Sequence, residues 1–445
     1  MKIKVMKFGG TSVATAEARM ASALRVVQAK EQGYSPVVVV SAIGRRGAPY
    51  ATDTLLGLLR EIDPGVEPEA RESDMMIACG EILSSVIFAH TLKTLGHASS
   101  AFRGGQAGIR TDGVYGNARI VSIKPAALLK TCETGAIPVV CGFQGTFAQE
   151  GMPGAELTTL GRGGSDTTGS ALGVALGAEA VEIYTDVDGI KTADPDAVPH
   201  APTLRKVTYD EVAEIAHLGA KVVHPRAAEI AMAAKVPLWV KNTFTEDEGT
   251  VIVPREQFPG RRATGVTHTG KLVYLQFDLS GLEAKPRVAL EARVYETMAR
   301  YDVNLFMLNI SPNSTGFAVP RDQYPLVQDV LDGLVIPMEG TIGMFQIGGA
   351  SREVETQAQL LAPLGTVRRI VASLTEGCTM VSLVGHEFMQ QAGLFYRVLS
   401  VLHEESIPVL QTGDSDYSLS VLVPESETNR AVRVLHDRFG LAEVV

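Results

Sequence analysis

Two glycine-rich segments of the chain place charged side chains where phosphate and carboxylate chemistry would need them. The first reads Lys7-Phe-Gly-Gly-Thr-Ser12 and lies between an apolar run and a helical pattern. Its glycines allow the backbone to turn sharply and to approach a ligand closely, and the N–H groups that open the helix form an anion site. Lys7 reaches the same anion as a point charge. The segment matches neither a Walker A loop nor a dinucleotide fingerprint, and a tight turn without a ligand stays an alternative.

The second segment, Thr158-Thr-Leu-Gly-Arg-Gly-Gly-Ser-Asp166, leads into a helix rich in alanine and glycine. A loop with three glycines loses much conformational entropy when it becomes ordered. Such a loop is usually found where the backbone must approach a ligand closely, and we interpret this segment in that way. Arg162 offers a planar fork for a carboxylate, and Asp166 can accept hydrogen bonds from an ammonium group. Asp166 also stands near the start of the helix, so N-capping is the alternative for this residue.

Three further candidates place charged residues at the end of a strand, after a helix or inside a helix. Tyr184-Thr-Asp-Val-Asp-Gly189 is an expected strand that runs into an acidic turn, although Asp-Gly after a strand also forms plain turns. Gly219-Ala-Lys-Val-Val-His-Pro225 follows an expected helix, and its Lys221 projects either into a cleft or into water. Glu81 interrupts an apolar helical stretch and needs a cationic partner, unless its face of the helix is exposed.

The elements that must position these residues alternate between short apolar runs and helical patterns. Continuous Val and Ile runs between helices are typical of a parallel sheet covered on both faces. We therefore predict an α/β sandwich with a mainly parallel central sheet in the first half of the chain. The expected strands are Ile3–Phe8, Pro36–Ser41, Ile137–Cys141, Ala180–Thr185 and Pro237–Lys241, with helices at Glu17–Lys30 and Ser170–Leu176.

The character of the sequence changes after Asn242. Residues 243–269 are rich in charged residues, glycine and proline, and we predict a linker with one strand at Thr250–Val253. A weak internal repeat then suggests two α+β modules from a duplication, with a single unrelated α+β domain as the alternative. The stretch 324–370 is either an expansion of the first module or an inserted loop. The first copy comprises helix 292–300 and strands 303–310 and 315–319, and the second comprises helix 395–404, strands 407–410 and 418–423, and helix 427–439.

Size and composition exclude several classes of protein. A length of 445 residues suits two or three domains. A net charge of −10 with scattered Lys and Arg argues against nucleic acid as a partner. The N-terminus breaks into glycines before a signal-peptide apolar region forms, and no window approaches the roughly 18 apolar residues of a membrane span. The four cysteines form no C-x-x-C pair and read as reduced core thiols. We expect a cytoplasmic protein without a membrane partner.

Together and in this order, the motifs resemble those of the aspartate kinases of the amino-acid kinase superfamily. The duplicated C-terminal segment is similar to the paired ACT modules of that family. The resemblance implies a kinase domain at 1–242, a linker at 243–269 and ACT-type modules at 270–340 and 341–445. The motifs that carry it are Lys7–Ser12, Thr159–Asp166, Thr185–Gly189 with Asp194 and Pro195, Gly219–Pro225, and Tyr50–Leu56, the last resembling the single-function kinases of Gram-positive bacteria.

The resemblance also implies a function. ATP would give its γ-phosphoryl group to the side-chain carboxylate of L-aspartate, forming 4-phospho-L-aspartate and ADP, the first step toward the amino acids of the aspartate family. Mg2+ is expected on the ATP phosphates, with no metal held by side chains. An end product (lysine, threonine or diaminopimelate) is expected to inhibit the enzyme, and a homodimer is expected to form through the C-terminal modules.

The motifs and the resemblance assign residues to each role. The expected catalytic residues are Lys7, Lys221 and Asp166. ATP is expected at Lys7, Phe8, Gly9, Gly10, Ser41, Thr185, Asp186, Lys191, Asp194 and Lys221. Aspartate is expected at Thr52, Glu81, Arg162, Gly163, Gly164, Ser165 and Asp166, and the effector at Asp278, Ser280, Gly281, Gln411 and Asp414.

Two positions depart from the family pattern. Lys191 stands where the family usually carries an aromatic or apolar residue, and Asp196 stands where it carries an arginine. These departures favour one rival, a non-catalytic sensor that binds nucleotide without turnover. A kinase for another acid, such as acetylglutamate or glutamate, is a second rival, which gives no reason for the paired C-terminal modules.

Overall fold

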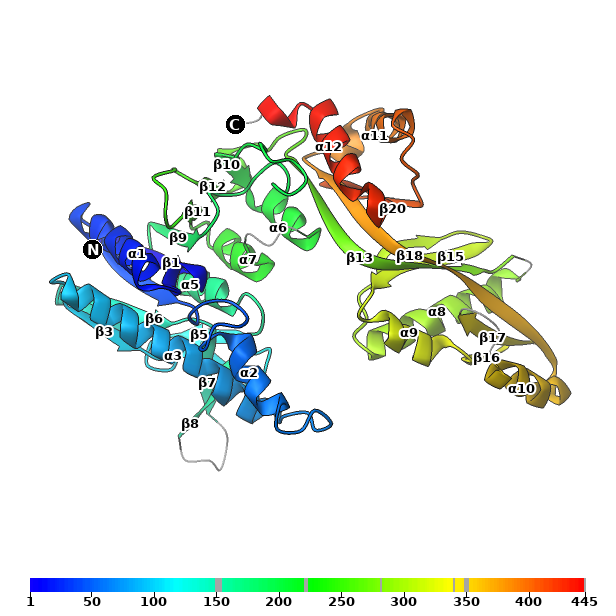
Figure 1. The fold of residues 1–445 in the computed structure, drawn as a ribbon, viewed down its shortest axis with the longest axis horizontal. Helices are drawn as coiled ribbons and strands as arrows, with labels where there is room; N and C mark the ends of the chain where they lie inside the picture. The colour runs from blue at the N-terminus through cyan, green and yellow to red at the C-terminus, as the bar shows by residue number, and fades with distance from the viewer. Residues whose placement is uncertain (149–153, 220–222, 281, 339–340, 348–351, 444–445) are drawn as a thin grey trace. The chain divides into compact units, whose positions relative to one another are not determined.

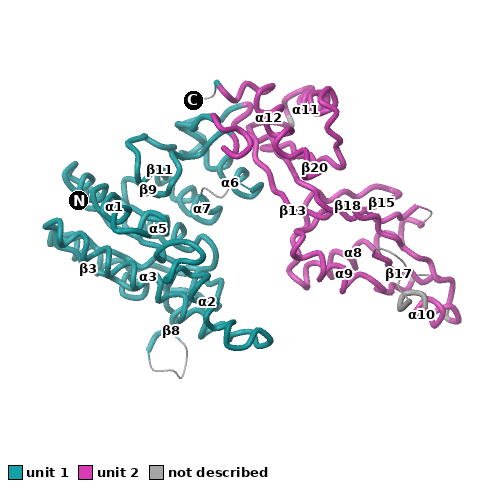
Figure 2. Tube along the Cα trace, in the orientation of Figure 1, with its two compact units in different colours: residues 1–192, 201–261, 443–445 teal, residues 193–200, 262–442 magenta. Residues whose placement is uncertain are grey.

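The computed structural model describes residues 1–148, 154–219, 223–280, 282–338, 341–347 and 352–443. The chain divides into two compact units, which Figure 2 colours teal and magenta; Figure 1 labels the helices and strands. Unit 1 comprises residues 1–192, 201–261 and 443–445, and unit 2 comprises residues 193–200 and 262–442.

The main sheet of unit 1 is parallel at its centre, as predicted. β1 (Ile3–Phe8) pairs in parallel with β2 (Ser35–Val40) on one side and with β9 (Ala180–Thr185) on the other. Val37–Val40 is fully buried, because helices cover both faces of the sheet. The strand order is β10-β12-β11-β9-β1-β2-β6-β3, with β3 (Ser99–Phe102), β6 (Ile137–Cys141), β10 (Lys206–Thr208), β11 (Leu238–Asn242) and β12 (Thr250–Val253).

Different helices cover the two faces of this sheet. Side chains of β1 alternate between the faces, and Phe8 packs in a core cluster with residues of α1 (Ala16–Glu31) and α3 (Ala70–Thr94). On the other face α5 (Gly164–Ala175) lies close to the sheet, since a Cβ on Gly173 would approach Val181 within 2.2 Å. The remaining helices of unit 1 are η1 (Thr11–Val13), α2 (Thr52–Arg60), α4 (Ala126–Glu133), α6 (Tyr209–His217), α7 (Pro225–Ala233) and η2 (Arg255–Gln257).

A second, four-stranded sheet lies beside α3. Its order is β5-β4-β7-β8, and β7 and β8 form an antiparallel pair. β8 ends at Thr159, directly before the second glycine-rich segment, so this sheet positions one of the two predicted loops. The strands are β4 (Ile109–Thr111), β5 (Ile120–Ile123), β7 (Gln144–Ala148) and β8 (Ala155–Thr159).

One helix departs from the expectation about membrane spans. α3 has 25 residues, and an 18-residue window of it reaches a mean hydropathy of 1.6, enough for a span by length and composition. Half of that window is buried inside the unit, and α3 packs on β3 and β6. It also carries two buried acidic side chains, Asp74 and Glu81, so its apolar composition is that of a core helix.

Unit 2 is built on two long antiparallel strands. β13 (Gly265–Asp278) pairs with β18 (Thr366–Val384) along most of its length, with irregularities near Thr269 and Leu272. β13 begins inside the segment predicted to be a linker. The other elements are α8 (Ala284–Arg300), β14 (Phe306–Ile310), β15 (Ser314–Pro320), α9 (Tyr324–Leu331), β16 (Val335–Met338), β17 (Thr341–Ile347), α10 (Arg352–Leu361), η3 (Ala362–Leu364), η4 (Phe388–Gln390), α11 (Leu394–Glu404), β19 (Gln411–Asp414), β20 (Ser418–Pro424), η5 (Glu425–Glu427), α12 (Thr428–Arg438) and η6 (Leu441–Glu443).

The segment 324–370 is an expansion of the first module. β17 pairs in parallel with the first half of β18, and β18 pairs with β13 in the same sheet. Phe345 of β17 lies 5.3 Å from Phe277 of β13, ring centre to ring centre, in a shared core. The second half of β18 instead pairs with β20. The two modules therefore share β13 and β18 instead of following one another along the chain.

Two smaller predictions are wrong. The strand expected at 407–410 is absent from the described structure, which has a strand at Gln411–Asp414 instead. Pro408 interrupts the expected run and has no N–H to donate to a neighbouring strand. Cys132, Cys141 and Cys378 are buried as expected, but Cys79 is exposed on α3.

Candidate active site

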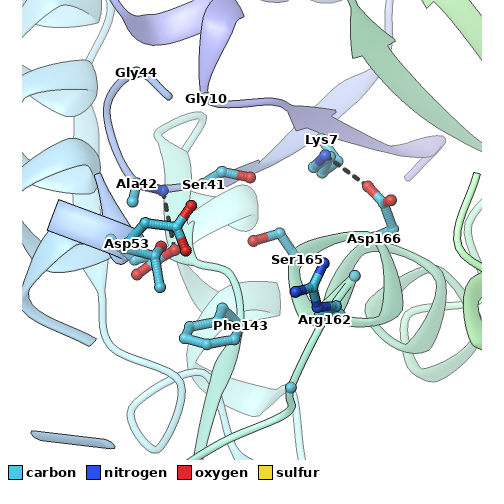
Figure 3. A pocket seen from close by; sticks show the side chains of 15 residues that line it. Lys7, Gly10, Ser41, Ala42, Gly44, Asp53, Phe143, Arg162, Ser165 and Asp166 are labelled. Carbon is cyan, nitrogen blue, oxygen red and sulfur yellow. Dashed lines mark hydrogen bonds and ion pairs between the residues drawn. The ribbon is translucent and has the colours of Figure 1, made fainter. Parts of the chain in front are cut away.

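A cavity of about 410 Å3 opens in unit 1 at the carboxyl ends of β1 and β2. Ligands of open α/β sheets bind at this end of the strands. Figure 3 shows Arg162, Ser165 and Asp166 on the α5 side of the cavity, with Ser41, Ala42 and Asp53 opposite them. Among the described residues, those lining it are Lys7, Gly10, Ser41, Ala42, Gly44, Thr52, Asp53, Glu81, Phe143, Gly161, Arg162, Gly163, Gly164, Ser165 and Asp166.

The two glycine-rich segments meet in an ion pair. Lys7 Nζ at the end of β1 lies 2.6 Å from Asp166 Oδ1 in the first turn of α5, and the two side chains are 10% and 15% exposed. Gly163, not Asp166, is the N-cap residue of α5, so the capping alternative for Asp166 is wrong. Gly163 has φ +68°, and a Cβ there would lie 2.1 Å from the His224 ring. This position therefore requires glycine.

The loop after β1 touches the loop after β2 through its backbone. Gly44 N donates to Gly10 O at 3.0 Å, and a Cβ on Gly10 would lie 2.4 Å from Gly44 O. Gly9 N donates to Tyr184 O at 3.1 Å. The pair of glycines is thus explained by close approach of the backbone. Phe8 is fully buried and stacks on Phe88 and Tyr184, so its side chain belongs to the core.

Glu81 is buried at the cavity wall, and the alternative of an exposed face is wrong. Its side chain is 2% exposed. Oε1 accepts a hydrogen bond from Ala42 N at 3.0 Å, whereas Oε2 is buried without a hydrogen-bond partner. Burial raises the pKa of Glu81 to about 8, against the opposing effect of the Ala42 N–H group. A cation brought into the cavity would find an acceptor there.

Arg162 complements Glu81 with the opposite charge. Its side chain is exposed at the cavity, and it has no ion-pair or hydrogen-bond partner within the part of the chain that the structure describes. An unpaired guanidinium is suited to bidentate recognition of a carboxylate. Ser165 is buried beside it, and Gly164 packs so closely on Phe143 that a Cβ would lie 2.8 Å from its ring.

Several predicted ATP residues do not line this cavity. Asp186, after β9, pairs with Arg45 at 2.6 Å, and Thr185 Oγ1 donates to Asp186 Oδ1. Lys191 Nζ donates to Ala201 O at 3.2 Å, which ties down the loop after β9. Asp194 lies in the segment 193–200 of unit 2, and its Oδ1 accepts from Asp196 N. Lys221 lies outside the described residues.

Sequence reasoning assigned no role to several residues at or beside the site, including Ala42, Gly44 and Gly161 of the cavity wall. Asp53 lines the cavity one position after Thr52, the first residue of α2. Phe143 lines it with φ +70°, for which the sequence gives no signal. His224 packs on Gly163 with its Nδ1 buried and unpartnered, and burial lowers its pKa. Asp74 is fully buried seven residues before Glu81, a spacing that places both on one face of α3.

The predicted effector residues lie on two elements of unit 2. Asp278 ends β13, and its Oδ1 accepts from Ser280 N and Oγ, which lowers the pKa of Asp278. Gln411 and Asp414 belong to β19. Gly281 lies outside the described residues. Among the described residues no hydrogen bond or ion pair joins Asp278 or Ser280 to β19.

Unit 2 also holds a polar cavity of about 350 Å3 at the start of α11, which the sequence did not predict. Arg262 and Arg397 are exposed on its wall and have no carboxylate partner within the described ranges. His386 Nε2 lies 3.5 Å from Glu387 Oε1, and Gln391 Nε2 donates to Arg262 O and His386 O. We refer to it below as the α11 cavity.

Comparison with known proteins decides the family. The amino acid kinase family model matches residues 2–242, and an ACT domain model matches residues 381–439. Aspartokinase 1 of Bacillus subtilis is 37% identical over 449 residues, covering 100% of both chains. The aspartokinase of Mycolicibacterium smegmatis is 36% identical and covers 99% of this chain and 97% of its own. The chain belongs to the aspartokinases of the amino acid kinase family.

Solved structures agree with this aspartokinase in fold. Aspartokinase III of E. coli in complex with aspartate and ADP has a TM-score of 0.71 at 22% identity, covering 99% of this chain and 100% of its own. The aspartate kinase of Clostridium acetobutylicum has a TM-score of 0.68 at 17% identity, covering 98% and 100%. The expected fold, an amino-acid kinase domain followed by ACT modules, is thereby confirmed. Because the similarity to these aspartokinases extends over the full length of the chain, the chain is an aspartate kinase.

Proposed function

We propose that this aspartokinase transfers the γ-phosphoryl group of Mg-ATP to the side-chain carboxylate of L-aspartate, giving 4-phospho-L-aspartate and ADP. One observation carries the proposal: a single cavity holds a lysine at a glycine turn, an unpaired guanidinium and a buried carboxylate oxygen without a partner. The lysine is suited to a phosphate, the guanidinium to the α-carboxylate of aspartate, and the carboxylate oxygen to its α-ammonium group.

The aspartate side of the site consists of Arg162 and Glu81. Arg162 pairs with the α-carboxylate as a bidentate partner. Glu81 Oε2 accepts from the α-ammonium group, and this cation favours the ionised form of a carboxylate that burial otherwise keeps neutral. Thr52, Gly163, Gly164, Ser165 and Asp166 complete the proposed aspartate site.

The phosphate side consists of Lys7 and the backbone around it. Lys7 places one positive charge at the end of β1, and Asp166 holds its ammonium group in place. The first turn of α5 adds N–H groups and a helix dipole that favour an anion. Lys191 and Asp194 bond within the polypeptide, so their part in ATP binding is indirect. The further proposed ATP residues are Phe8, Gly9, Gly10, Ser41, Thr185, Asp186 and Lys221.

The chemistry needs no general base. The acceptor carboxylate is already ionised near neutral pH, so one of its oxygens bonds to the γ-phosphorus while the bond from that phosphorus to the β-phosphate oxygen breaks and ADP leaves. Alignment and charge neutralisation then supply the catalysis. Lys7 stabilises charge on the transferred group, and Lys221 is proposed to do so from a second side.

Magnesium fits this site as a partner of the nucleotide. Among the described residues no group of three or more His, Cys, Asp or Glu side chains could hold a metal ion, and the cavity carries only the separate carboxylates of Asp53, Glu81 and Asp166. Such a donor set suits an ion held mainly by phosphate oxygens. When bound, Mg2+ neutralises charge on the ATP phosphates.

We further propose that an end product of the pathway inhibits the enzyme through the ACT modules. The ACT match at 381–439 supports this, and the structure of E. coli aspartokinase III in complex with lysine and aspartate is similar in fold, with a TM-score of 0.68 at 22% identity. Lysine, threonine and diaminopimelate are the candidates, with Asp278, Ser280, Gly281, Gln411 and Asp414 as proposed contacts. A cytoplasmic homodimer that pairs through these modules completes the proposal.

A coupled ADP-release assay tests the proposal. We expect turnover with Mg-ATP and L-aspartate, little with L-glutamate, and inhibition by one of the three end products. If only glutamate or acetylglutamate supported turnover, that acid and not aspartate would be the substrate. If the protein bound nucleotide but turned over none of these acids, it would be a non-catalytic sensor and not a kinase.

A further inference from the structure

Asp74 is a fully buried carboxylate that the proposed reaction does not use. It lies on α3 with an exposed fraction of 0%. Its Oδ2 accepts from Thr159 N at 2.8 Å, its Oδ1 accepts from Thr159 Oγ1 at 2.6 Å, and Gly116 N lies 3.0 Å from both oxygens. No cation pairs with it within the described part of the chain. A buried polar group is costly unless hydrogen bonds compensate it. The donors from Thr159 and Gly116 provide that compensation, and because they bind both oxygens they also fix the position of the Asp74 side chain.

The donors of Asp74 flank the loop that carries Arg162. Thr159 ends β8 three residues before Arg162. Gly116 and Asn117 lie against Gly161, where an added Cβ would come within 3.0 Å of Asn117 Oδ1 and 3.2 Å of Gly116 O. Ala118 N donates to Thr159 O at 2.8 Å, which closes the contact between the two segments. One carboxylate therefore binds two of the segments that set the backbone of Arg162, while Leu160 in the same loop also bonds to Phe143 O and to Arg226.

Arg162 depends on that backbone for its position. Its guanidinium has no partner within the described residues, so no side-chain contact holds it when the cavity is empty. Preorganised groups bind their ligand at lower cost than mobile ones. A residue that fixes the loop thus acts on the affinity for the ligand of Arg162.

α3 also sets the distance between the two proposed aspartate contacts. Asp74, Ala78 and Glu81 follow one another at i, i+4 and i+7 on one face of the helix. Ala78 O accepts from Gln144 Nε2 at 3.2 Å, and Glu81 Oε1 accepts from Ala42 N at 3.0 Å. Seven helical residues span about 10 Å along the axis. The helix holds Glu81 at one end of this span and the anchor of the Arg162 loop at the other.

We propose that Asp74 is a positioning residue for aspartate: through Thr159 and Gly116 it holds the Arg162 loop at a fixed place relative to Glu81. The inference rests on the proposed role of Arg162. It predicts that loss of Asp74 weakens aspartate binding through Arg162 and leaves ATP binding intact.

The test compares Asp74→Asn in the wild-type and in the Arg162→Ala background, in the full-length enzyme. In the wild type we expect KM for aspartate to rise by about tenfold or more, since buried donors lose an acceptor, while KM for ATP stays within twofold. In the Arg162→Ala background the same change should leave KM for aspartate unaltered. An equal rise in both backgrounds, or a parallel rise in KM for ATP, would overturn the proposal.

Two further variants keep the test decisive. Thr159→Val removes only the hydroxyl donor and should raise KM for aspartate in the same direction by a smaller factor, even where Asp74→Asn does not fold. Glu156→Gln is the matched control, because Glu156 on β8 pairs with Arg71 on α3 without touching the Arg162 loop. It should leave both KM values unchanged. If Arg162→Ala itself leaves KM for aspartate unchanged, the proposed function fails at that residue; if only Arg162→Ala raises it, the positioning role alone fails.

Discussion

The cavities of the two units differ in how their charged groups are held. In unit 1, Lys7 is paired with Asp166 and Glu81 is anchored by Ala42 N, and these side chains are largely buried. Arg162 at the same cavity is exposed and has no partner among the described residues, so it is the part of this site that is not fixed in advance. In unit 2, Arg262 and Arg397 stand exposed on the α11 cavity without a carboxylate partner in the described residues. A site whose charges are fixed before binding suits catalysis, because no reorganisation is needed during the reaction. Arg397 stacks on the Phe439 ring at 4.8 Å, and exposed arginines without a carboxylate partner suit binding of an anionic ligand.

The largest effect should come from Lys7, the cavity lysine that is held by an ion pair with Asp166. Lys7→Met keeps most of the length of the side chain but removes its charge, and we expect kcat to fall roughly 10³-fold because one preorganised donor to the transferring group is lost. Steady-state kinetics measures this, with thermal unfolding as a check of the fold. Lys2→Met, at an exposed lysine 3.8 Å from Glu179, is the control and should keep full activity. A near-normal kcat for Lys7→Met would show that Lys7 does not bind the transferred phosphoryl group.

Arg162 should show a smaller effect that is confined to one substrate. Arg162→Ala removes a charged partner of the substrate, and we expect KM for aspartate to rise by roughly 10²-fold with little change in ATP affinity. The melting temperature should not change, because Arg162 has no partner within the described protein. Calorimetric titration with ATP and with aspartate separates the two affinities. Equal loss of both would contradict the assignment.

Glu81 should make aspartate binding depend on pH. Since burial raises the pKa of Glu81 to about 8, the free enzyme carries a neutral acid below that pH and an ionised one above it. The α-ammonium group binds best to the ionised form, so kcat/KM for aspartate should rise from pH 6 to about 8 and then level off. Glu81→Gln should lower kcat/KM and flatten this rise. An unchanged profile would assign the pH dependence to another group.

The same pKa shift has a consequence for stability. Between the ordinary glutamate pKa of 4.5 and a pH of about 8, the folded state holds the Glu81 proton, whereas the unfolded state has lost it. This contribution to the free energy of unfolding therefore declines as pH rises through that window, by at most about 1.4 kcal/mol per pH unit. Chemical denaturation of wild type and Glu81→Gln at pH 5 and pH 8 measures it. The variant should lose less stability between the two pH values than wild type.

The smallest effect is expected in unit 2, where two variants distinguish between two possible effector sites. Asp278→Ala should shift the inhibition curve of the effective end product several-fold to higher concentration, because an exposed carboxylate contributes little to binding. Arg397→Gln, at the α11 cavity, is the comparison variant and should leave that curve in place. The opposite result would move the effector from the β13 and β19 residues to the α11 cavity.

The sequence by itself determined the local pattern of this protein. Apolar runs and their spacing predicted β1, β9 and β6 to the residue, since burial on both faces of a sheet requires continuous apolar side chains. The charged residues at glycine turns also predicted much of the cavity wall, because charged side chains and free backbone N–H groups are suited to phosphate and amino-acid groups.

Only the tertiary structure decided which of these groups meet. That Asp166 pairs with Lys7 instead of capping α5 depends on the strand order that brings β1 under α5. That Glu81 is buried beside Ala42, and that Asp74 reaches Thr159, depends on how α3 packs between the two sheets. The sharing of β13 and β18 by both modules depends on pairing between distant strands. Periodicity in a sequence sets which face of an element is apolar, but the partner across that face is chosen by packing between segments far apart in the chain.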